Sequence, residues 1–256
     1  MIRWLIQSVA DNPDLKVGRP PAGVLTEAEL RHFYGYTNPR RRHAWLLGRW
    51  TAKQLVRRTL SYSAGFSPTL QSFSIAQRSS GVPYIVSSAA APADMAVPTH
   101  PPLSLSISHR NDYALCAVAQ GRTEPPRLGV DLEIVQRCIG QGAMRQGAFT
   151  PDEIRDLDRA PAMLQTLMAV ATWSAKQSVM KLAQMDAPAA LPHIQCLLRP
   201  GRPRTWQAYL VEWNNPDVAE MSGSNRSVCG WWRVFECALR SGRQYVATLA
   251  VQGTRL

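Results

Sequence analysis

The sequence predicts an α+β fold, because helical patterns precede strand patterns in each half of the chain. Apolar residues recur at helical spacing over residues 26–59, and runs with strand spacing follow over residues 73–118. A second helical region at residues 151–184 is followed by strand patterns over residues 194–251. Helices and strands segregated in this way are typical of α+β architecture.

The first half begins with a helical stretch that Pro39 interrupts. The helix after this proline begins with Arg40-Arg41-Arg42. A polar turn at residues 109–112 joins the last two strands, which pair naturally as a hairpin. The elements of this half are predicted at residues 26–59 (helical) and 73–75, 85–86, 103–107 and 113–118 (strands), with a Ser-, Ala- and Pro-rich flexible loop at 87–102.

The second half also places helices before its main run of strands. Thr150 is predicted to cap a helix that starts at Pro151, and Glu153 to complete the capping box. Proline also suits the first turn of the next helix, near Pro161. The predicted elements are a strand at 128–134, helices at 151–158 and 161–184, and strands at 194–198, 206–213, 234–239 and 245–251 with a Ser241-Gly242 turn before the last.

Length and turn composition predict two lobes. With 256 residues, of which 45% are hydrophobic, the chain can bury one substantial core or two small ones. The turn-rich segment at residues 121–126 is the predicted boundary, which gives an N-terminal lobe at 1–124 and a C-terminal lobe at 125–256.

Hydropathy and cysteine spacing predict the compartment. The chain turns polar by Asp11, and no later stretch approaches eighteen apolar residues, which predicts a cytoplasmic protein without a membrane segment. The five cysteines are widely spaced and lack a CxxC pair, so we expect buried thiols and neither disulfides nor a zinc site.

The net charge of +11 favours polyanionic partners. Nucleic acid, anionic lipid, a phosphate-rich cofactor and an acidic protein all satisfy this requirement, and charge alone does not choose among them. The choice depends on motifs.

Asp131 and Glu133 form the first candidate site. Residues two apart on a strand point to the same face, so two carboxylates could share a hard cation such as Mg²⁺. Read alone, a D-x-E sequence is more often an ordinary acidic edge of a strand.

Two further segments contain candidate groups. Ser108 and His109 close a strand before a turn, where a hydroxyl, an imidazole and backbone amides could meet a phosphate, although read alone they are a capping serine and a surface histidine. Gln177 and Lys181 share a helix face, with Trp173 one turn earlier. Read alone, that helix carries a core tryptophan beside solvated lysines.

Taken in chain order, these segments resemble the large, two-lobed, surfactin-synthetase-activating type of 4′-phosphopantetheinyl transferase. The agreement covers roughly residues 40–185, and five motifs in family order outweigh the separate interpretations of each segment. The matching motifs are Gly81-Val82-Pro83, Ile107-Ser108-His109, Gly129-Val130-Asp131-Leu132-Glu133, Phe149-Thr150-Pro151-Asp152-Glu153 and the segment from Trp173 to Lys181.

The resemblance implies a pseudo-twofold pair of α+β lobes with coenzyme A, the substrate, in a cleft. The reaction it implies is transfer of 4′-phosphopantetheine to a serine of a carrier protein, with release of 3′,5′-ADP. Asp131, Glu133 and Gln177 correspond to the family's Mg²⁺ ligands, and Gln177 and Lys181 to its catalytic positions. The positions implied to contact coenzyme A are Arg41, Arg49, Lys53, Ser108, His109 and Lys176.

Gln177 departs from the family pattern, which has glutamate there. An amide is not a general base at pH 7, and loss of a general base typically costs on the order of 10² to 10⁴ in rate. Its carbonyl oxygen can still bind Mg²⁺, while a metal-bound water or another carboxylate takes the proton. Smaller departures are Ser80 and Val82 beside the glycine of the first motif, where the family often has a lysine, and a segment without glycine at residues 182–190.

Three functions therefore compete. The first is a Mg²⁺-dependent transferase that serves acidic acyl or peptidyl carrier proteins, and the second is a slow or non-catalytic homologue that binds coenzyme A or a carrier. Nucleic-acid binding is motivated only by charge, since no recognition motif is present. We expect no nucleic-acid or membrane partner, and a monomer because both lobes belong to one chain.

Overall fold

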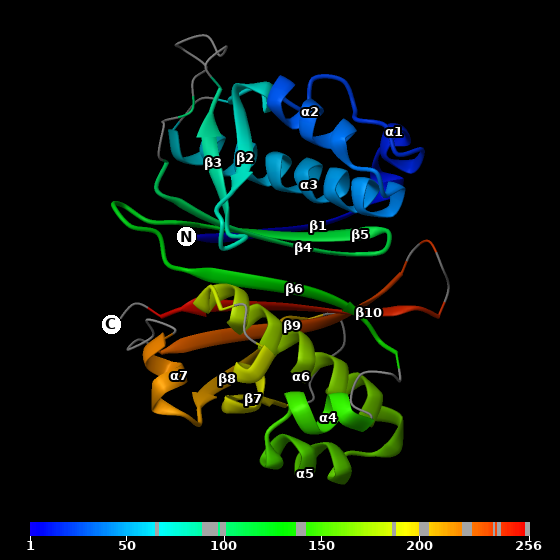
Figure 1. The fold of residues 1–256 in the computed structure, drawn as a ribbon, viewed down its shortest axis with the longest axis vertical. Coiled ribbons are helices and arrows are strands. Elements are labelled where there is room, and N and C mark those ends of the chain that lie inside the picture. Colours follow the sequence, from blue (N-terminus) through cyan, green and yellow to red (C-terminus); the bar gives the residue numbers. More distant parts are fainter. Residues whose placement is uncertain are drawn as a thin grey trace. The chain divides into compact units, whose positions relative to one another are not determined.

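The structure is a computed structural model that describes residues 1–64, 67–88, 97, 101–136, 142–185, 188–199, 205–221, 227–237, 239 and 242–253. The chain divides into two compact units, Met1–Pro125 (unit 1) and Pro126–Leu256 (unit 2). Both units combine helices with antiparallel strands, which confirms the α+β prediction (Figure 1).

Unit 1 places a long helix against a small antiparallel sheet. The sheet has the strand order β1-β5-β4, and β2 and β3 form a separate pair. Helix α3 contacts β1, β4 and β5 and buries apolar side chains such as Leu46 and Val56. The elements are β1 (Ile2–Ser8), α1 (Pro13–Lys16), α2 (Glu27–Gly35), α3 (Pro39–Ala64), β2 (Phe73–Gln77), β3 (Pro83–Ser87), β4 (Leu103–Arg110) and β5 (Tyr113–Gln120).

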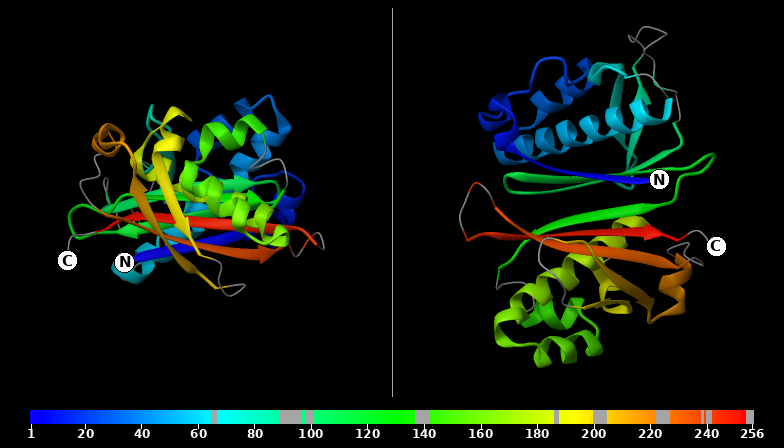
Figure 2. Two further views of the ribbon diagram at one scale, coloured as in Figure 1. Left: turned by 90° about the horizontal axis from the view of Figure 1, so that it is seen from below. Right: turned by 180° about the vertical axis from the view of Figure 1, so that it is seen from behind.

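Unit 2 is built around a five-stranded sheet with the strand order β6-β10-β9-β8-β7. Helix α6 lies along one face of this sheet and contacts β6 and β10 (Figure 2). The elements are β6 (Leu128–Ile134), α4 (Gly142–Ala148), α5 (Pro151–Arg159), α6 (Ala162–Ala183), β7 (Ile194–Leu198), β8 (Gln207–Trp213), α7 (Pro216–Met221), β9 (Val228–Glu236) and β10 (Gln244–Gln252).

Helix α6 approaches β6 closely because Gly129 has no side chain. A Cβ atom at Gly129 would lie 1.9 Å from the carbonyl oxygen of Ser178 and 2.7 Å from the amide nitrogen of Leu182. Both are backbone atoms of the helix, so no side-chain rotation could make room. Glycine at this position therefore sets the distance between the helix and the strand that carries Asp131.

The two units follow the same plan. Among the described residues, each runs from a strand through helices to four further strands, which α7 interrupts in unit 2. The order β1-β5-β4 in unit 1 corresponds to β6-β10-β9 in unit 2. A threonine capping box starts the first of the two corresponding helices in each unit, at Thr26 with Glu29 and at Thr150 with Glu153. The chain therefore contains an internal structural repeat, with one copy in each unit.

Several predicted elements differ from the observed ones. Strand β1 was not predicted, and neither were helices α1, α4 and α7. Strand β9 begins at Val228, six residues before the predicted start. Most of the predicted loop at 87–102, and Ser241 of the predicted last turn, lie outside the described residues.

Most of the described cysteines are buried. Cys116, Cys196 and Cys237 are buried free thiols, as predicted, whereas the free thiol of Cys229 is exposed, so the prediction of burial was wrong there. Cys138 lies outside the described residues. None of the helices in the described part of the chain is long and apolar enough to cross a membrane.

Candidate functional site

The centre of unit 2 contains an ion pair between β6 and α6. Lys181 Nζ lies 2.8 Å from Asp131 Oδ1 and donates a second hydrogen bond of 2.9 Å to the carbonyl oxygen of Val130. Asp131 is buried, whereas 37% of the Lys181 side chain is exposed. The pair therefore joins an interior carboxylate to a cation that solvent or a ligand can reach.

Two buried hydroxyl groups engage the other side of the same carboxylate. Ser174 Oγ donates to Asp131 Oδ2 over 3.0 Å. Thr248, which lies directly opposite Asp131 in the β6–β10 register, has its Oγ1 3.0 Å from Ser174 Oγ and 2.8 Å from the Ser174 carbonyl oxygen. Both oxygens of Asp131 thus have hydrogen-bond donors supplied by α6.

Sequence reasoning missed Ser174 and Thr248 as members of this site. Ser174 lies within the tryptophan-to-lysine motif, so its place three residues before Gln177 was a usable signal. Thr248 occurs within an apolar strand pattern, where one threonine is unremarkable. No sequence feature distinguishes it.

Gln177 lies on the face of α6 that carries Ser174 and Lys181, because residues three and four apart share a helix face. Its side chain is half-buried. Glu133 is also half-buried and, two residues beyond Asp131 on β6, projects to the same side of the strand. Asp131, Glu133 and Gln177 are therefore grouped within one unit.

Oxygen atoms of these three side chains have the chemistry that Mg²⁺ prefers. Over the described residues, no group of three or more His, Cys, Asp or Glu side chains could hold a metal ion. Asp131 and Glu133 are two carboxylates, so a complete coordination shell would need the Gln177 carbonyl oxygen, water or oxygens of a substrate. This donor set fits a Mg²⁺ ion that is shared with phosphates.

A second buried ion pair in unit 2 joins Lys176 to Glu153. The side chain of Lys176 is fully buried, and its Nζ lies 2.5 Å from Glu153 Oε2. The ammonium also donates to the carbonyl oxygens of Ala148 (2.6 Å) and Leu191 (2.9 Å), and Glu153 Oε1 accepts from the amide of Cys196 (2.8 Å). Burial lowers the pKa of Lys176, and the charge of Glu153 opposes that shift.

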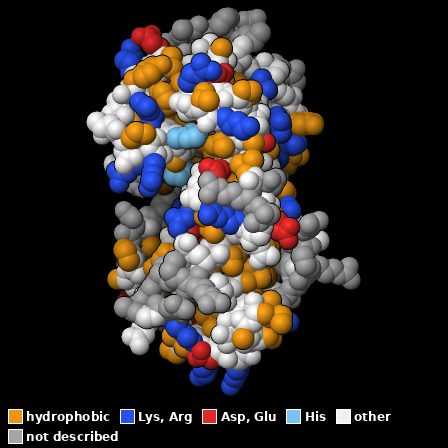
Figure 3. Space-filling view, turned by 90° about the vertical axis from the view of Figure 1, so that its right-hand side faces the viewer, with side chains coloured by type: hydrophobic (Ala, Val, Ile, Leu, Met, Phe, Trp, Pro, Cys, Tyr) orange, Lys and Arg blue, Asp and Glu red, His pale blue; other side chains and the backbone are white. Residues whose placement is uncertain are grey.

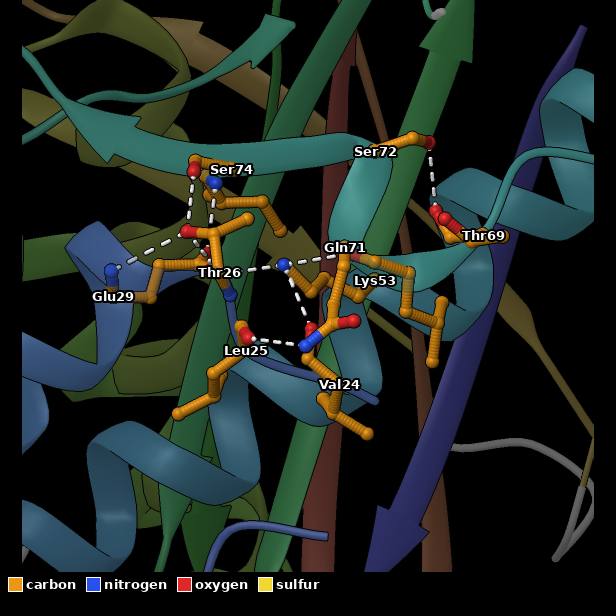
Figure 4. A network of polar contacts seen from close by, with 11 residues as sticks. Val24, Leu25, Thr26, Glu29, Lys53, Thr69, Gln71, Ser72 and Ser74 are labelled. Carbon is orange, nitrogen blue, oxygen red and sulfur yellow. Dashed lines mark hydrogen bonds and ion pairs between the residues drawn. The ribbon is translucent and has the colours of Figure 1, made fainter. Parts of the chain in front are cut away.

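Unit 1 contains the same arrangement around Lys53 (Figure 4). Lys53 Nζ lies 2.5 Å from Glu29 Oε2 and donates to the carbonyl oxygens of Val24 (2.9 Å) and Leu70 (2.8 Å). Glu29 Oε1 accepts from the amide of Ile75 over 3.0 Å. We call this lysine–glutamate arrangement the clamp of each unit.

The burial of Lys53 and Lys176 in the clamps contradicts the prediction that these two lysines contact coenzyme A. Both side chains are 0% exposed, and each ammonium directs its three protons at partners inside its own unit. The sequence does contain a signal for this role, which sequence reasoning missed. Residues 50–54 read Trp-Thr-Ala-Lys-Gln and residues 173–177 read Trp-Ser-Ala-Lys-Gln, so the lysine belongs to a repeated motif.

The remaining predicted residues lie in unit 1. The Arg49 guanidinium is buried 5.0 Å above the ring of Trp45, and its burial lowers its pKa. Arg41 is exposed in the first turn of α3. At the end of β4, Ser108 is buried and His109 is exposed.

Helix α3 meets the end of β4 beside His109. A Cβ atom at Gly48 would lie 3.2 Å from Ile107 and 3.7 Å from the imidazole of His109. Gly48 directly precedes Arg49, so this part of unit 1 brings the helix with the predicted arginines next to the predicted histidine. The candidate residues form two groups, one in each unit.

Comparison with known proteins gives one family match that lies within unit 2. A family model described as the 4′-phosphopantetheinyl transferase superfamily matches residues 127–219. Holo-[acyl-carrier-protein] synthases of two Streptococcus agalactiae strains are 33% identical over 95 residues, which cover 37% of this chain and 71% of theirs.

Solved holo-acyl-carrier-protein synthases give a weaker structural match. The Bacillus anthracis enzyme, solved in complex with CoA (3′,5′-ADP), aligns with a TM-score of 0.33 and 20% identity over 46% of this chain and 91% of that one. The Neisseria meningitidis enzyme aligns with a TM-score of 0.34 and 20% identity over 46% of this chain and 94% of that one.

Proposed function

Because the chain belongs to the 4′-phosphopantetheinyl transferase superfamily, we propose that it transfers the phosphopantetheine arm of coenzyme A to a serine of an acyl or peptidyl carrier protein, releasing 3′,5′-ADP. The observation that carries the proposal is the Asp131–Lys181 pair, which lies within the matched residues 127–219. A buried carboxylate beside a partly exposed ammonium can serve both a cation and a phosphate.

Lys181 is proposed to act on the phosphates of coenzyme A. During transfer the serine oxygen forms a bond to the phosphorus that bears pantetheine, and the bond from that phosphorus to 3′,5′-ADP breaks. Negative charge increases on the departing phosphate, and the Lys181 ammonium, held by Val130 and Asp131, is oriented to donate to it. A Mg²⁺ ion held by Asp131, Glu133 and Gln177 would supply Lewis-acid stabilisation of the phosphate oxygens.

The identity of Gln177 supports a second candidate function. The serine proton has to leave during the reaction, and an amide does not accept it at pH 7. Gln54 occupies the corresponding place in unit 1, where its Oε1 accepts a hydrogen bond of 2.8 Å from Arg57. In unit 2 the residue that corresponds to Arg57 is Met180, and its side chain has no N–H group that could donate to Gln177. The alternative is therefore a slow or non-catalytic homologue that binds coenzyme A or a carrier.

The charge of the chain supports an acidic protein partner. The formal net charge is +11, and in the view of Figure 3 each unit shows more Lys and Arg side chains than acidic ones on its described surface. Opposite charge on a carrier protein would speed its encounter with this surface. We further propose a cytoplasmic monomer with Mg²⁺ as its cation and without a nucleic-acid or membrane partner.

Intact-mass analysis of a carrier protein tests the proposal. An apo carrier is incubated with coenzyme A, Mg²⁺ and the protein, in parallel with its Gln177→Glu and Lys181→Met variants. A mass gain equal to the phosphopantetheine arm supports transfer, and loss of that gain in Lys181→Met assigns it to this site.

Two outcomes separate the candidate functions. Transfer by Gln177→Glu alone would mean that Gln177 silences an otherwise complete site. If neither the unmodified chain nor Gln177→Glu modifies any of a panel of apo carriers, catalysis is refuted for those partners.

A further inference from the structure

The hydrogen bonds around Asp131 have a defined direction, because each hydroxyl group has a single proton to donate. The hydroxyl groups of Ser174 and Thr248 carry one proton each, and Ser174 is the one that reaches the carboxylate, at 3.0 Å from Oδ2. Thr248 Oγ1 reaches both the hydroxyl (3.0 Å) and the carbonyl oxygen (2.8 Å) of Ser174. Thr248 therefore donates to Ser174, and Ser174 donates to Asp131.

These hydroxyl groups are fully buried, unlike the lysine on the other side of the carboxylate. Ser174 and Thr248 are 0% exposed and belong to the middle of α6 and β10. Lys181 reaches Asp131 through a long side chain that is 37% exposed. The hydroxyl pair therefore fixes the Asp131 carboxylate even when Lys181 turns towards a ligand.

The repeat shows that this contact is not a general requirement of the fold. Thr51 occupies the place of Ser174 in the corresponding motif of unit 1, and it is also 0% exposed. Within the described part of the chain, Thr51 Oγ1 is a buried hydroxyl without a hydrogen-bond partner. The hydroxyl is present in both units, but it bonds a carboxylate in unit 2 and no group among the described residues of unit 1.

We infer that Ser174 and Thr248 are positioning residues, which hold Asp131 in the orientation that binds a divalent cation. The inference rests on the proposed function, because the cation it concerns is the one proposed above. Groups that hydrogen-bond a metal-binding carboxylate fix its orientation, and their loss typically weakens metal affinity by about 10- to 100-fold. Neither residue is expected to touch the substrate.

A titration with Mn²⁺ tests the inference without turnover. Mn²⁺ replaces Mg²⁺, and electron paramagnetic resonance measures the free ion while the protein is saturated with coenzyme A and no carrier is present. We expect Ser174→Ala to raise the Mn²⁺ dissociation constant by about 10-fold or more, and Thr248→Val to raise it less. Ser174→Thr should retain affinity, because threonine keeps the hydroxyl.

Thr51→Ala is the matched control. It removes the hydroxyl at the same repeat position in unit 1, where no carboxylate accepts from it, so the Mn²⁺ dissociation constant should not change. In transfer assays, Ser174→Ala should raise the Mg²⁺ concentration for half-maximal rate and leave the KM for coenzyme A near its original value. A purely structural defect would not separate these two constants.

The outcomes distinguish this inference from the proposed function. Unchanged Mn²⁺ affinity in both Ser174→Ala and Thr248→Val overturns the inference, even if transfer is observed. Mn²⁺ binding that Asp131→Asn does not weaken overturns it as well. If Mn²⁺ affinity depends on Asp131 and Ser174 but no carrier is modified, the inference stands and the proposed transfer fails.

Discussion

Lys53 and Lys176 occupy the same position in the two repeated units. Each ammonium lies 2.5 Å from a capping-box glutamate, Glu29 or Glu153, and donates to two backbone carbonyl oxygens. In unit 1 the clamp joins the start of α2, the middle of α3 and the segment before β2. In unit 2 it joins the start of α5, the middle of α6 and the segment before β7. Their shared geometry indicates a role in folding rather than in ligand binding.

Removing a clamp lysine should destabilise its own unit. Lys176→Met leaves Glu153 buried without its cation and two carbonyl oxygens without a donor, which costs about 3–5 kcal/mol in the free energy of unfolding. Lys53→Met should have a similar effect in unit 1. Urea denaturation measures the loss, and hydrogen exchange followed by mass spectrometry identifies the unit that opens.

Lys16→Met is the control for this prediction, because Lys16 is exposed and should change stability by less than about 0.5 kcal/mol. The double variant Lys176→Met/Glu153→Gln should recover part of the loss, since it removes the uncompensated charge. A Lys176→Met variant as stable as the unmodified chain would contradict the role of the clamp.

Gly129→Ala should disturb unit 2 through backbone overlap. The added Cβ would lie 1.9 Å from the Ser178 carbonyl oxygen, so α6 must move away from β6, at a cost of about 3 kcal/mol or more. Because α6 carries Ser174 and Lys181, metal affinity should fall as well. Gly147→Ala is the matched control, since a Cβ there meets nothing within 4 Å, and it should be neutral or slightly stabilising by urea denaturation.

Lys181→Met should reduce transfer without unfolding the protein. Loss of a charged donor to the phosphates is expected to lower kcat/KM by about 10² to 10³. Stability should fall less than in Lys176→Met, because the lysine side chain is 37% exposed and Ser174 still donates to Asp131. Steady-state kinetics with an apo carrier checks the first expectation and thermal unfolding the second. Unchanged kcat/KM would remove Lys181 from the mechanism.

Burial of Tyr209 should make the protein sensitive to alkali. Burial, with a smaller contribution from Cys196, raises the pKa of Tyr209 well above its usual value of 10.0. The unfolded chain therefore loses this proton before the folded protein does, so stability is intact below pH 10.0 and falls as the pH rises further. Urea denaturation between pH 8 and pH 11 measures the slope.

Tyr209→Phe should flatten this alkaline decline. At pH 7 the variant should lose about 1 kcal/mol, because Tyr209 Oη is 2.9 Å from Ser178 Oγ and that hydrogen bond disappears. Tyr62→Phe is the control, since Tyr62 is 76% exposed and should leave the slope unchanged. An equal slope in Tyr209→Phe and the unmodified chain would assign the alkaline loss to other groups.

Elements with local signals were predictable from the sequence. The predicted bounds of β6 and β7 agree with the structure, because apolar residues and turns mark both ends. The predicted capping box of Thr150 and Glu153 is present, since its residues are three apart and need no distant partner. The β4–β5 hairpin was predicted for the same reason.

Features that depend on distant partners were not predictable from local patterns. Strand β1 exists through its pairing with β5, in which Trp4 lies opposite Ala117. Lys176 occurs in a helix, where a lysine is usually solvated, and its burial depends on a glutamate from the preceding helix. The hydroxyl of Thr248 meets Ser174 only after β10 has paired with β6.

Two copies of one unit in a single chain can evolve separately. A dimer of identical subunits carries every substitution twice, so a change that helps one site must be tolerated at the other. In the part of the chain that the structure describes, the hydroxyl at position 174 has a carboxylate partner while the one at position 51 has none. A repeat within one chain thus permits a side chain to keep a polar partner in one copy and to lose it in the other.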